Sequence, residues 1–241
     1  MSLLFILLVG LIAGTVSGIV GTGSSIMLMP VLIYAYGPKQ AVPIMAVAAV
    51  LANVSRILAW WREVDWRACA AYSMTAIPAA ALGARTLLAL PSRVVDLSIG
   101  VFLIAMVPLR HWLTHHQFKL SLWHLAIGGA VIGFLTGIVV STGPLSVPLF
   151  LFYGVTKGAF LATEAASSLG IYLSKSVTFE RFGALTSDIA LKGVIAGSSL
   201  MFGAFIAKRF VLRLEPDAFR LVMDGIMLAA GLSLLWSAAT S

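Results

Sequence analysis

Two long stretches of this chain, Met1–Pro38 and Leu120–Thr156, contain no Asp, Glu, Lys or Arg. An amphipathic helix of a soluble protein needs a hydrated face, and neither stretch has the charges to supply one. Each is long enough to enter a bilayer, whose hydrocarbon core takes about 20 apolar residues of helix. The whole chain is 60% hydrophobic and only 10% charged, against about 25% charged in soluble domains. We therefore predict an integral membrane protein, which excludes soluble enzymes and nucleic-acid-binding proteins.

The few charged residues are mostly basic, since 16 Lys and Arg against 9 Asp and Glu give a net charge of +7. Basic residues at helix ends contact anionic lipid headgroups, and an anionic substrate is equally compatible with this balance. No carboxylate or cysteine accompanies His111, His115 and His116, so we interpret them as loop residues and expect no metal site and no cofactor. The expected partners are a small anion and membrane lipid, and the sequence is also compatible with a homodimer.

Apolar runs separated by short turns divide the chain into two series, which predict about eight to ten membrane segments. The runs are 3–20, 25–36, 41–60, 68–90 and 94–113 in the first series, and 122–140, 144–154, 158–178, 187–208 and 217–237 in the second. A polar segment lies between the two series. We therefore expect a first half, 1–113, a connector, 114–121, and a second half, 122–241.

The two halves resemble each other at an offset of about 119 residues. Each opens with a Gly-x-x-x-Gly pattern, followed by a glycine-containing break, a proline and a serine next to a cation. The corresponding features are Gly14 and Gly18 with Gly133 and Gly137, the break 21–25 with 141–144, Pro30 with Pro148, and Ser55-Arg56 with Ser174-Lys175. Because these features recur in the same order, we infer an internal duplication.

The length of the first apolar stretch indicates how the halves are oriented. A straight helix over residues 3–36 would be about 51 Å long, well beyond a hydrocarbon core of about 30 Å. A hairpin bent at the glycine break, either re-entrant or fully spanning, fits better and returns the chain to its starting side. Three further crossings then give the second half the opposite orientation. The expected fold is an all-α polytopic membrane protein with an inverted repeat, each half combining a broken hairpin with three transmembrane helices.

The two breaks are candidate anion-binding segments. Irregular backbone at membrane depth is tolerated only where protein or a wet cavity satisfies its polar groups. Helices that restart after a break direct amide donors and a positive dipole end toward such a cavity, and nearby hydroxyls add donors. The alternative is a pair of tight turns with close glycine packing. The break residues that we expect to bind substrate are Gly21, Thr22, Gly23, Ser24, Ser25, Ser141, Thr142, Gly143 and Pro144.

Arg56 and Lys175 are cations within apolar segments, and they are equivalent in the repeat. Each has a polar residue three positions earlier on the same helix face, Asn53 and Tyr172 respectively. We predict that these four residues also bind substrate, with the two cations on opposite sides of a central site. The alternative is snorkelling, in which a long side chain keeps its charge at the membrane surface.

Glu164 is the most conspicuous acidic residue, because it lies within an apolar segment. An intramembrane carboxylate is costly and indicates a functional role by default. We therefore predict that Glu164 carries a proton that is coupled to transport. The alternative is that it reaches water, or pairs with Lys157 or Lys175.

Together these motifs resemble the TauE/SafE sulfite exporter family, also called the toluene sulfonate uptake permease family. The likeness covers essentially the whole chain, although the family often has consecutive glycines where this chain has Ser24-Ser25. It implies a multi-pass protein of the bacterial inner membrane that exports or takes up sulfite, sulfonates or related organosulfur anions. The features that carry the resemblance are the repeated Gly-x-x-x-Gly and glycine break, Val64-Asp65-Trp66-Arg67, Leu82-Gly83-Ala84 and Phe202-Gly203-Ala204.

The function expected from the sequence is secondary transport of a small sulfur oxyanion by alternating access, coupled to protons and directed outward. The first alternative is a passive anion channel with the same donors. The second is a membrane-embedded enzyme, which would need a catalytic triad, a metal cluster or a carboxylate pair in the bilayer. The sequence contains no such pattern and no phosphate-binding loop for ATP, so we expect a protein that is not an enzyme.

Overall fold

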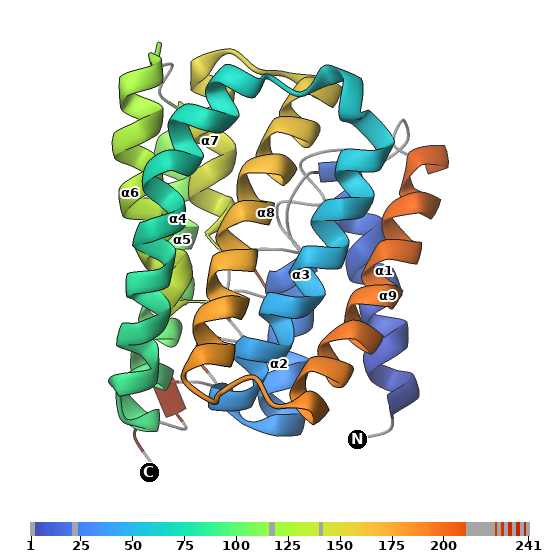
Figure 1. Ribbon diagram of the computed structural model, residues 1–241, viewed down its shortest axis with the longest axis vertical. Helices are drawn as coiled ribbons and strands as arrows, with labels where there is room; N and C mark the ends of the chain where they lie inside the picture. Colours follow the sequence, from blue (N-terminus) through green and yellow to red (C-terminus); the bar gives the residue numbers. More distant parts are fainter. Residues whose placement is uncertain are drawn as a thin grey trace.

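The computed structural model describes residues 3–20, 24–115, 119–139 and 142–210, together with seven single positions between 225 and 239. These residues form nine α-helices and one short 3-10 helix, and no strand occurs among them (Figure 1). In order along the chain, the elements are α1 (Leu3–Val20), α2 (Ser24–Tyr36), α3 (Pro38–Trp60), η1 (Trp61–Glu63), α4 (Trp66–Ala89), α5 (Ser92–His115), α6 (Leu122–Ile138), α7 (Gly143–Tyr153), α8 (Lys157–Arg181) and α9 (Ser187–Phe210).

The observed helix ends lie within three residues of the predicted ones for all nine of these helices. The predicted run 217–237 lies mostly outside the described residues. The connector expected at 114–121 includes the last residues of α5, which ends at His115. It extends to the residue before α6, which begins at Leu122. The division into halves stays a prediction.

Both breaks separate a longer helix from a short one. With 13 and 11 residues, α2 and α7 extend about 20 and 17 Å, less than the hydrocarbon thickness of about 30 Å. Neither crosses a bilayer as a straight helix. In the part of the chain described, two stretches are both long and apolar enough to cross by themselves, Lys39–Glu63 and Ser187–Ala207.

The most extensive helix contacts join helices of the predicted first half, 1–113, to helices of the predicted second half, 122–241. At the centre, α3 and α8 lie side by side and run in opposite directions (Figure 1). On one side of this centre α4 packs against α6, and on the other α1 packs against α9 (Figure 1). The α1–α2 pair lies toward the lower end of the view and the α6–α7 pair toward the upper end. This arrangement brings the first residues of α2 and of α7 toward the middle of the bundle.

Glycines make these cross-packings possible. A Cβ atom on Gly14 of α1 would lie 2.2 Å from the carbonyl oxygen of Leu200 in α9. Its repeat equivalent, Gly133 of α6, would place a Cβ 2.4 Å from the carbonyl oxygen of Ala76 in α4. The Gly-x-x-x-Gly segments therefore let two backbones approach directly, as small residues do in membrane helix pairs.

Local turn chemistry sets where the central helices begin. Gly37 has φ +75°, a left-handed conformation that favours glycine, and Pro38 then opens α3. At the start of α4, the Asp65 carboxylate accepts hydrogen bonds from the backbone amides of Arg67 and Ala68, both at 3.0 Å. Gly154, with φ +109°, ends α7 just before α8 begins.

We predict that Gly133→Ala destabilises the protein whereas Gly128→Ala, on the same helix, does not. The Gly133 substitution must move the backbone of Ala76, and such overpacking costs about 1–3 kcal/mol. At Gly128 the atoms nearest to the added Cβ belong to the flexible side chain of Leu149, and alanine gains about 1 kcal/mol of helix propensity over glycine. Thermal unfolding in detergent measures both effects. Equal stability of the two variants would contradict direct backbone packing of α6 on α4.

Candidate functional site

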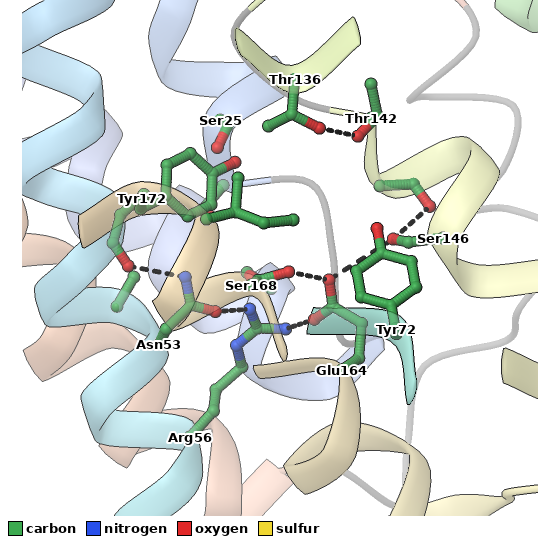
Figure 2. Close-up of a pocket in the computed structure, with 16 residues that line it drawn as sticks. Ser25, Asn53, Arg56, Tyr72, Thr136, Thr142, Ser146, Glu164, Ser168 and Tyr172 are labelled. Carbon is green, nitrogen blue, oxygen red and sulfur yellow. Dashed lines mark hydrogen bonds and ion pairs between the residues drawn. The ribbon is translucent and has the colours of Figure 1, made fainter. Parts of the chain in front are cut away.

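A polar cavity lies where the two broken helices meet the central pair α3 and α8, with α4 closing one side (Figure 2). Its free space is about 30 Å³, enough for about one or two water molecules. The polar residues that line the cavity are Ser17, Ser24, Ser25, Asn53, Arg56, Tyr72, Thr136, Thr142, Ser146, Glu164, Ser168 and Tyr172. The other four lining residues carry no side-chain oxygen or nitrogen and are Ala49, Ala52, Gly143 and Ile171.

A buried ion pair joins the two central helices at this cavity. Nη1 of Arg56 on α3 donates to Oε2 of Glu164 on α8 at 2.8 Å. The two side chains are only 9% and 5% exposed. Charges removed from water to this extent are tolerated when they are paired and hydrogen-bonded, and these two neutralise each other. Both residues were expected within apolar segments, but their pairing with each other was not predicted.

Hydroxyl and amide groups complete the coordination of this pair. The second carboxylate oxygen of Glu164, Oε1, accepts from the Ser168 hydroxyl at 2.8 Å. The Ser146 hydroxyl can donate either to this oxygen, at 3.4 Å, or to the Gly143 carbonyl, at 3.3 Å. Nη2 of Arg56 donates to Oδ1 of Asn53, and the Asn53 amide donates to the carbonyl of Ala49 at 2.8 Å. Figure 2 shows these bonds as one connected network. Such a network fixes both charges in defined orientations.

Both breaks supply residues to the cavity lining. In the first half, α2 begins at Ser24, and both Ser24 and Ser25 are buried against the cavity. In the second, Thr142 precedes α7 and its hydroxyl bonds that of Thr136 on α6. Two helix N-termini, with their amide donors, therefore face one space. The predicted site residues Gly21, Thr22, Gly23 and Ser141 lie outside the described residues, as does the side chain of Pro144.

Lys175 is completely buried but does not line the cavity. Its ammonium group donates to the carbonyl of Thr136 and, at 3.3 Å, to that of Val139, so it satisfies carbonyls at the C-terminal end of α6. The rings of Tyr172 and Phe179 flank it at 5.7 and 5.9 Å. The geometry therefore indicates that Lys175 stabilises the end of α6 next to the second break. It does not place Lys175 in contact with a ligand in the cavity.

Part of the cavity lining agrees with the repeat predicted from the sequence, but the two charged residues do not. Five pairs of lining residues are separated by 119 positions, and the two charged residues fall outside these pairs. The position equivalent to Arg56 is Lys175, which lies behind the cavity, and the position equivalent to Glu164 is the buried residue Met45. The five pairs are Ser17 and Thr136, Ser24 and Gly143, Ala49 and Ser168, Ala52 and Ile171, and Asn53 and Tyr172.

Several lining residues were not among the predicted site residues. The repeat could have identified Ser17 and Thr136, since both are polar and equivalent in the two halves. Ser146 follows the second break by less than two turns, and Ser168 lies one helical turn after Glu164. No pattern in the sequence indicated Tyr72. This residue comes from α4, and its ring packs on that of Phe150 with the centroids 5.1 Å apart.

The chemistry available in this cavity is that of hydrogen-bond donors and one ion pair. Within the described part of the chain, no three His, Cys, Asp or Glu side chains come together to hold a metal ion. Serine, threonine and tyrosine hydroxyls can donate to an oxyanion, and a guanidinium can bind it through two parallel bonds. Arg56 is held by a carboxylate in this conformation, so a ligand anion would have to share or replace that partner.

We predict that Glu164→Leu lowers the free energy of unfolding by about 3–5 kcal/mol, because it leaves Arg56 buried without a counter-charge. The double variant Arg56→Met/Glu164→Leu should recover most of this loss, since both buried charges are gone. Lys192→Met is the matched control: it breaks the partly exposed pair with Asp188 and should cost less than about 1 kcal/mol. Additive effects of the single Arg56 and Glu164 substitutions would show that the two charges do not stabilise each other.

Comparison with known proteins agrees with this architecture. The family model described as "Sulfite exporter TauE/SafE" matches residues 6–234. Two relatives are the "Probable membrane transporter protein y4hK" of Sinorhizobium fredii, 30% identical over 72% of this chain and 73% of its own, and the "Probable membrane transporter protein YjnA" of Bacillus subtilis, 22% identical over 95% and 98%. No solved structure matches the chain. The chain therefore belongs to the TauE/SafE sulfite exporter family of membrane transporters.

Proposed function

We propose that this protein moves a small sulfur oxyanion, such as sulfite or an organic sulfonate, across the bacterial inner membrane by proton-coupled alternating access. The observation that carries the proposal is the buried cavity in which both broken helices and the Arg56–Glu164 pair meet. The sulfur chemistry and the outward direction rest on the family description. The anionic character of the ligand rests on the cavity itself.

The donors around the cavity suit an oxyanion. Hydroxyls come from several helices, and the N-termini of α2 and α7 add backbone amides with positive dipole ends. An oxyanion such as sulfite presents three oxygens, each of which can accept more than one hydrogen bond. The free space of about 30 Å³ limits the ligand to a small one and requires the site to widen when the ligand enters.

Alternating access is supported by how the halves are assembled. Each broken hairpin packs on a helix of the other half, and α3 and α8 meet at the centre in opposite directions (Figure 1). This is the arrangement expected of an inverted repeat, in which one group of helices rocks against the other around a midplane site. A passive channel is the second candidate, but the small cavity and the ion pair across it favour a protein that must change shape to pass an anion.

We predict saturable uptake of sulfite and of methanesulfonate into proteoliposomes, with a rate that changes when a proton gradient is imposed. Saturation is expected because each cycle carries a bound anion. Flux that rises linearly with concentration and produces single-channel currents would identify a channel. If neither anion moves with or without the gradient, the sulfur substrate class is wrong, and other small anions become the candidates.

We predict that Thr142→Val and Ser146→Ala each raise the KM for the transported anion by about 3- to 10-fold, since a hydrogen bond contributes about 1 kcal/mol net. Thr86→Val is the matched control. Its hydroxyl makes an ordinary bond to the Leu82 carbonyl at 2.9 Å on an exposed helix face, far from the cavity lining. Unchanged KM values for both cavity variants would remove the second break from the binding site.

A further inference from the structure

We propose that the Glu164 carboxylate occupies the place of the transported anion in the ligand-free protein, and that the anion displaces it from Arg56 as Glu164 takes up a proton. Anion and proton would then bind together, one of each per cycle. This inference rests on the proposed function, which it extends by stating how the proton and the anion are linked and with which sign.

The donors around Glu164 resemble those that an oxyanion would use. A guanidinium N–H from Arg56 and the Ser168 hydroxyl each donate to the carboxylate at 2.8 Å, and the Ser146 hydroxyl, which can donate to this carboxylate or to the Gly143 carbonyl, lies 3.4 Å from it. These donors come from three different helices, α3, α7 and α8. A guanidinium with nearby hydroxyls is also the set that an oxyanion requires. The carboxylate thus has the interactions that a bound sulfur oxyanion would need.

The cavity also has little free space. A volume of about 30 Å³ holds about one or two water molecules, whereas sulfite has a sulfur atom with three oxygens. The anion therefore has little room beside an undisturbed Arg56–Glu164 pair. It can bind where the carboxylate group now lies, once Glu164 has turned away from the guanidinium (Figure 2).

The charge of the site also favours binding of a proton together with the anion. Arg56 and Glu164 together are neutral, so an added monoanion would give this buried site a net charge of −1. Uncompensated charge at membrane depth is costly. A proton on Glu164 restores neutrality and also removes the carboxylate charge that competes for Arg56. Because linkage is reciprocal, a proton that favours anion binding is itself bound more tightly when the anion is present.

Among the groups around the cavity, Glu164 is the residue that we expect to exchange this proton. Of the helices packed against α8, α3 contributes Arg56 and α4 contributes Tyr72 to the cavity, while α6 and α7 contribute hydroxyls. On α8 itself, Tyr172 lines the cavity and Lys175 is bound to the α6 carbonyls. The remaining packed element, η1, carries Arg62 and Glu63 at the start of α8, where the Glu63 carboxylate approaches Gly158. Among the described residues, Glu164 is the one carboxylate that lines the cavity.

This coupling has a consequence for direction. One monoanion moving with one proton carries no net charge, so transport responds to a pH difference and not to membrane potential. The anion leaves the cell whenever the product of anion and proton concentrations is greater inside. Export of an anion made in the cell and uptake driven by an acidic exterior are then the same cycle run in two directions.

The first test uses methanesulfonate, which stays a monoanion throughout the usable pH range, and the purified full chain. We expect the affinity of the wild type to rise as pH falls, by up to about tenfold per pH unit for one linked proton. Glu164→Gln should bind with little pH dependence, and binding should take up protons from a weakly buffered solution only in proteins that retain Glu164. Glu180→Gln, which neutralises an exposed carboxylate on the same helix, should behave as the wild type. A pH-independent wild type, or an unchanged slope in Glu164→Gln, would overturn the inference.

The second test separates this inference from the sulfur substrate class. If the wild type binds neither methanesulfonate nor sulfite, the substrate class fails, and formate serves as the probe instead. Glu164→Ala should be stabilised against thermal unfolding by millimolar formate, because formate replaces the missing carboxylate on Arg56, whereas the wild type should not respond. If Glu164→Ala does not fold, the same measurement is made on Glu164→Gln. A folded variant whose unfolding temperature is unchanged by formate would overturn the inference.

Discussion

A helix that breaks inside a bilayer leaves amide and carbonyl groups that only protein or trapped water can satisfy, and this requirement shapes the centre of the molecule. The amide ends of α2 and α7 face a common polar cavity. The carbonyl end of α6 receives the ammonium group of Lys175. Close glycine packing of α1 on α9 and of α6 on α4 holds the broken helices in place from outside. The site thus lies at the ends of broken helices, where backbone amide and carbonyl groups lack partners within their own helix.

The cavity lining agrees in part with the duplication expected from the sequence. Asn53 and Tyr172, which correspond at the offset of 119 residues, both line the cavity. The charges do not follow this symmetry, because Arg56 enters the cavity whereas Lys175 turns to the end of α6. A symmetric pair of free cations would hold an anion strongly from both sides. One cation with a carboxylate partner instead fits the proposed cycle, in which the affinity for the anion changes when Glu164 takes up a proton.

Much of the helical fold could be predicted from sequence, because charge-free runs and glycine breaks are local signals. Ser24 and Thr142 were expected at the site for the same reason, and both line the cavity. The Arg56–Glu164 pair could not be predicted, since its partners are 108 residues apart and meet only through the packing of α3 on α8. Tyr72 was missed because nothing in its own helix marks it. The different surroundings of Arg56 and Lys175 arise from tertiary packing, which their equivalent positions in the repeat do not determine.

Stability alone does not account for the ion pair at the centre. Replacing a buried pair with apolar residues of similar volume is often neutral or stabilising, whereas losing one partner is strongly destabilising. We therefore interpret the Arg56–Glu164 pair as one in which each charge can exchange its partner. A ligand anion can take the place of Glu164 at Arg56, and a proton can take the place of Arg56 at Glu164. Apolar side chains would close the same space at lower cost in free energy, but they would leave nothing for an anion or a proton to replace.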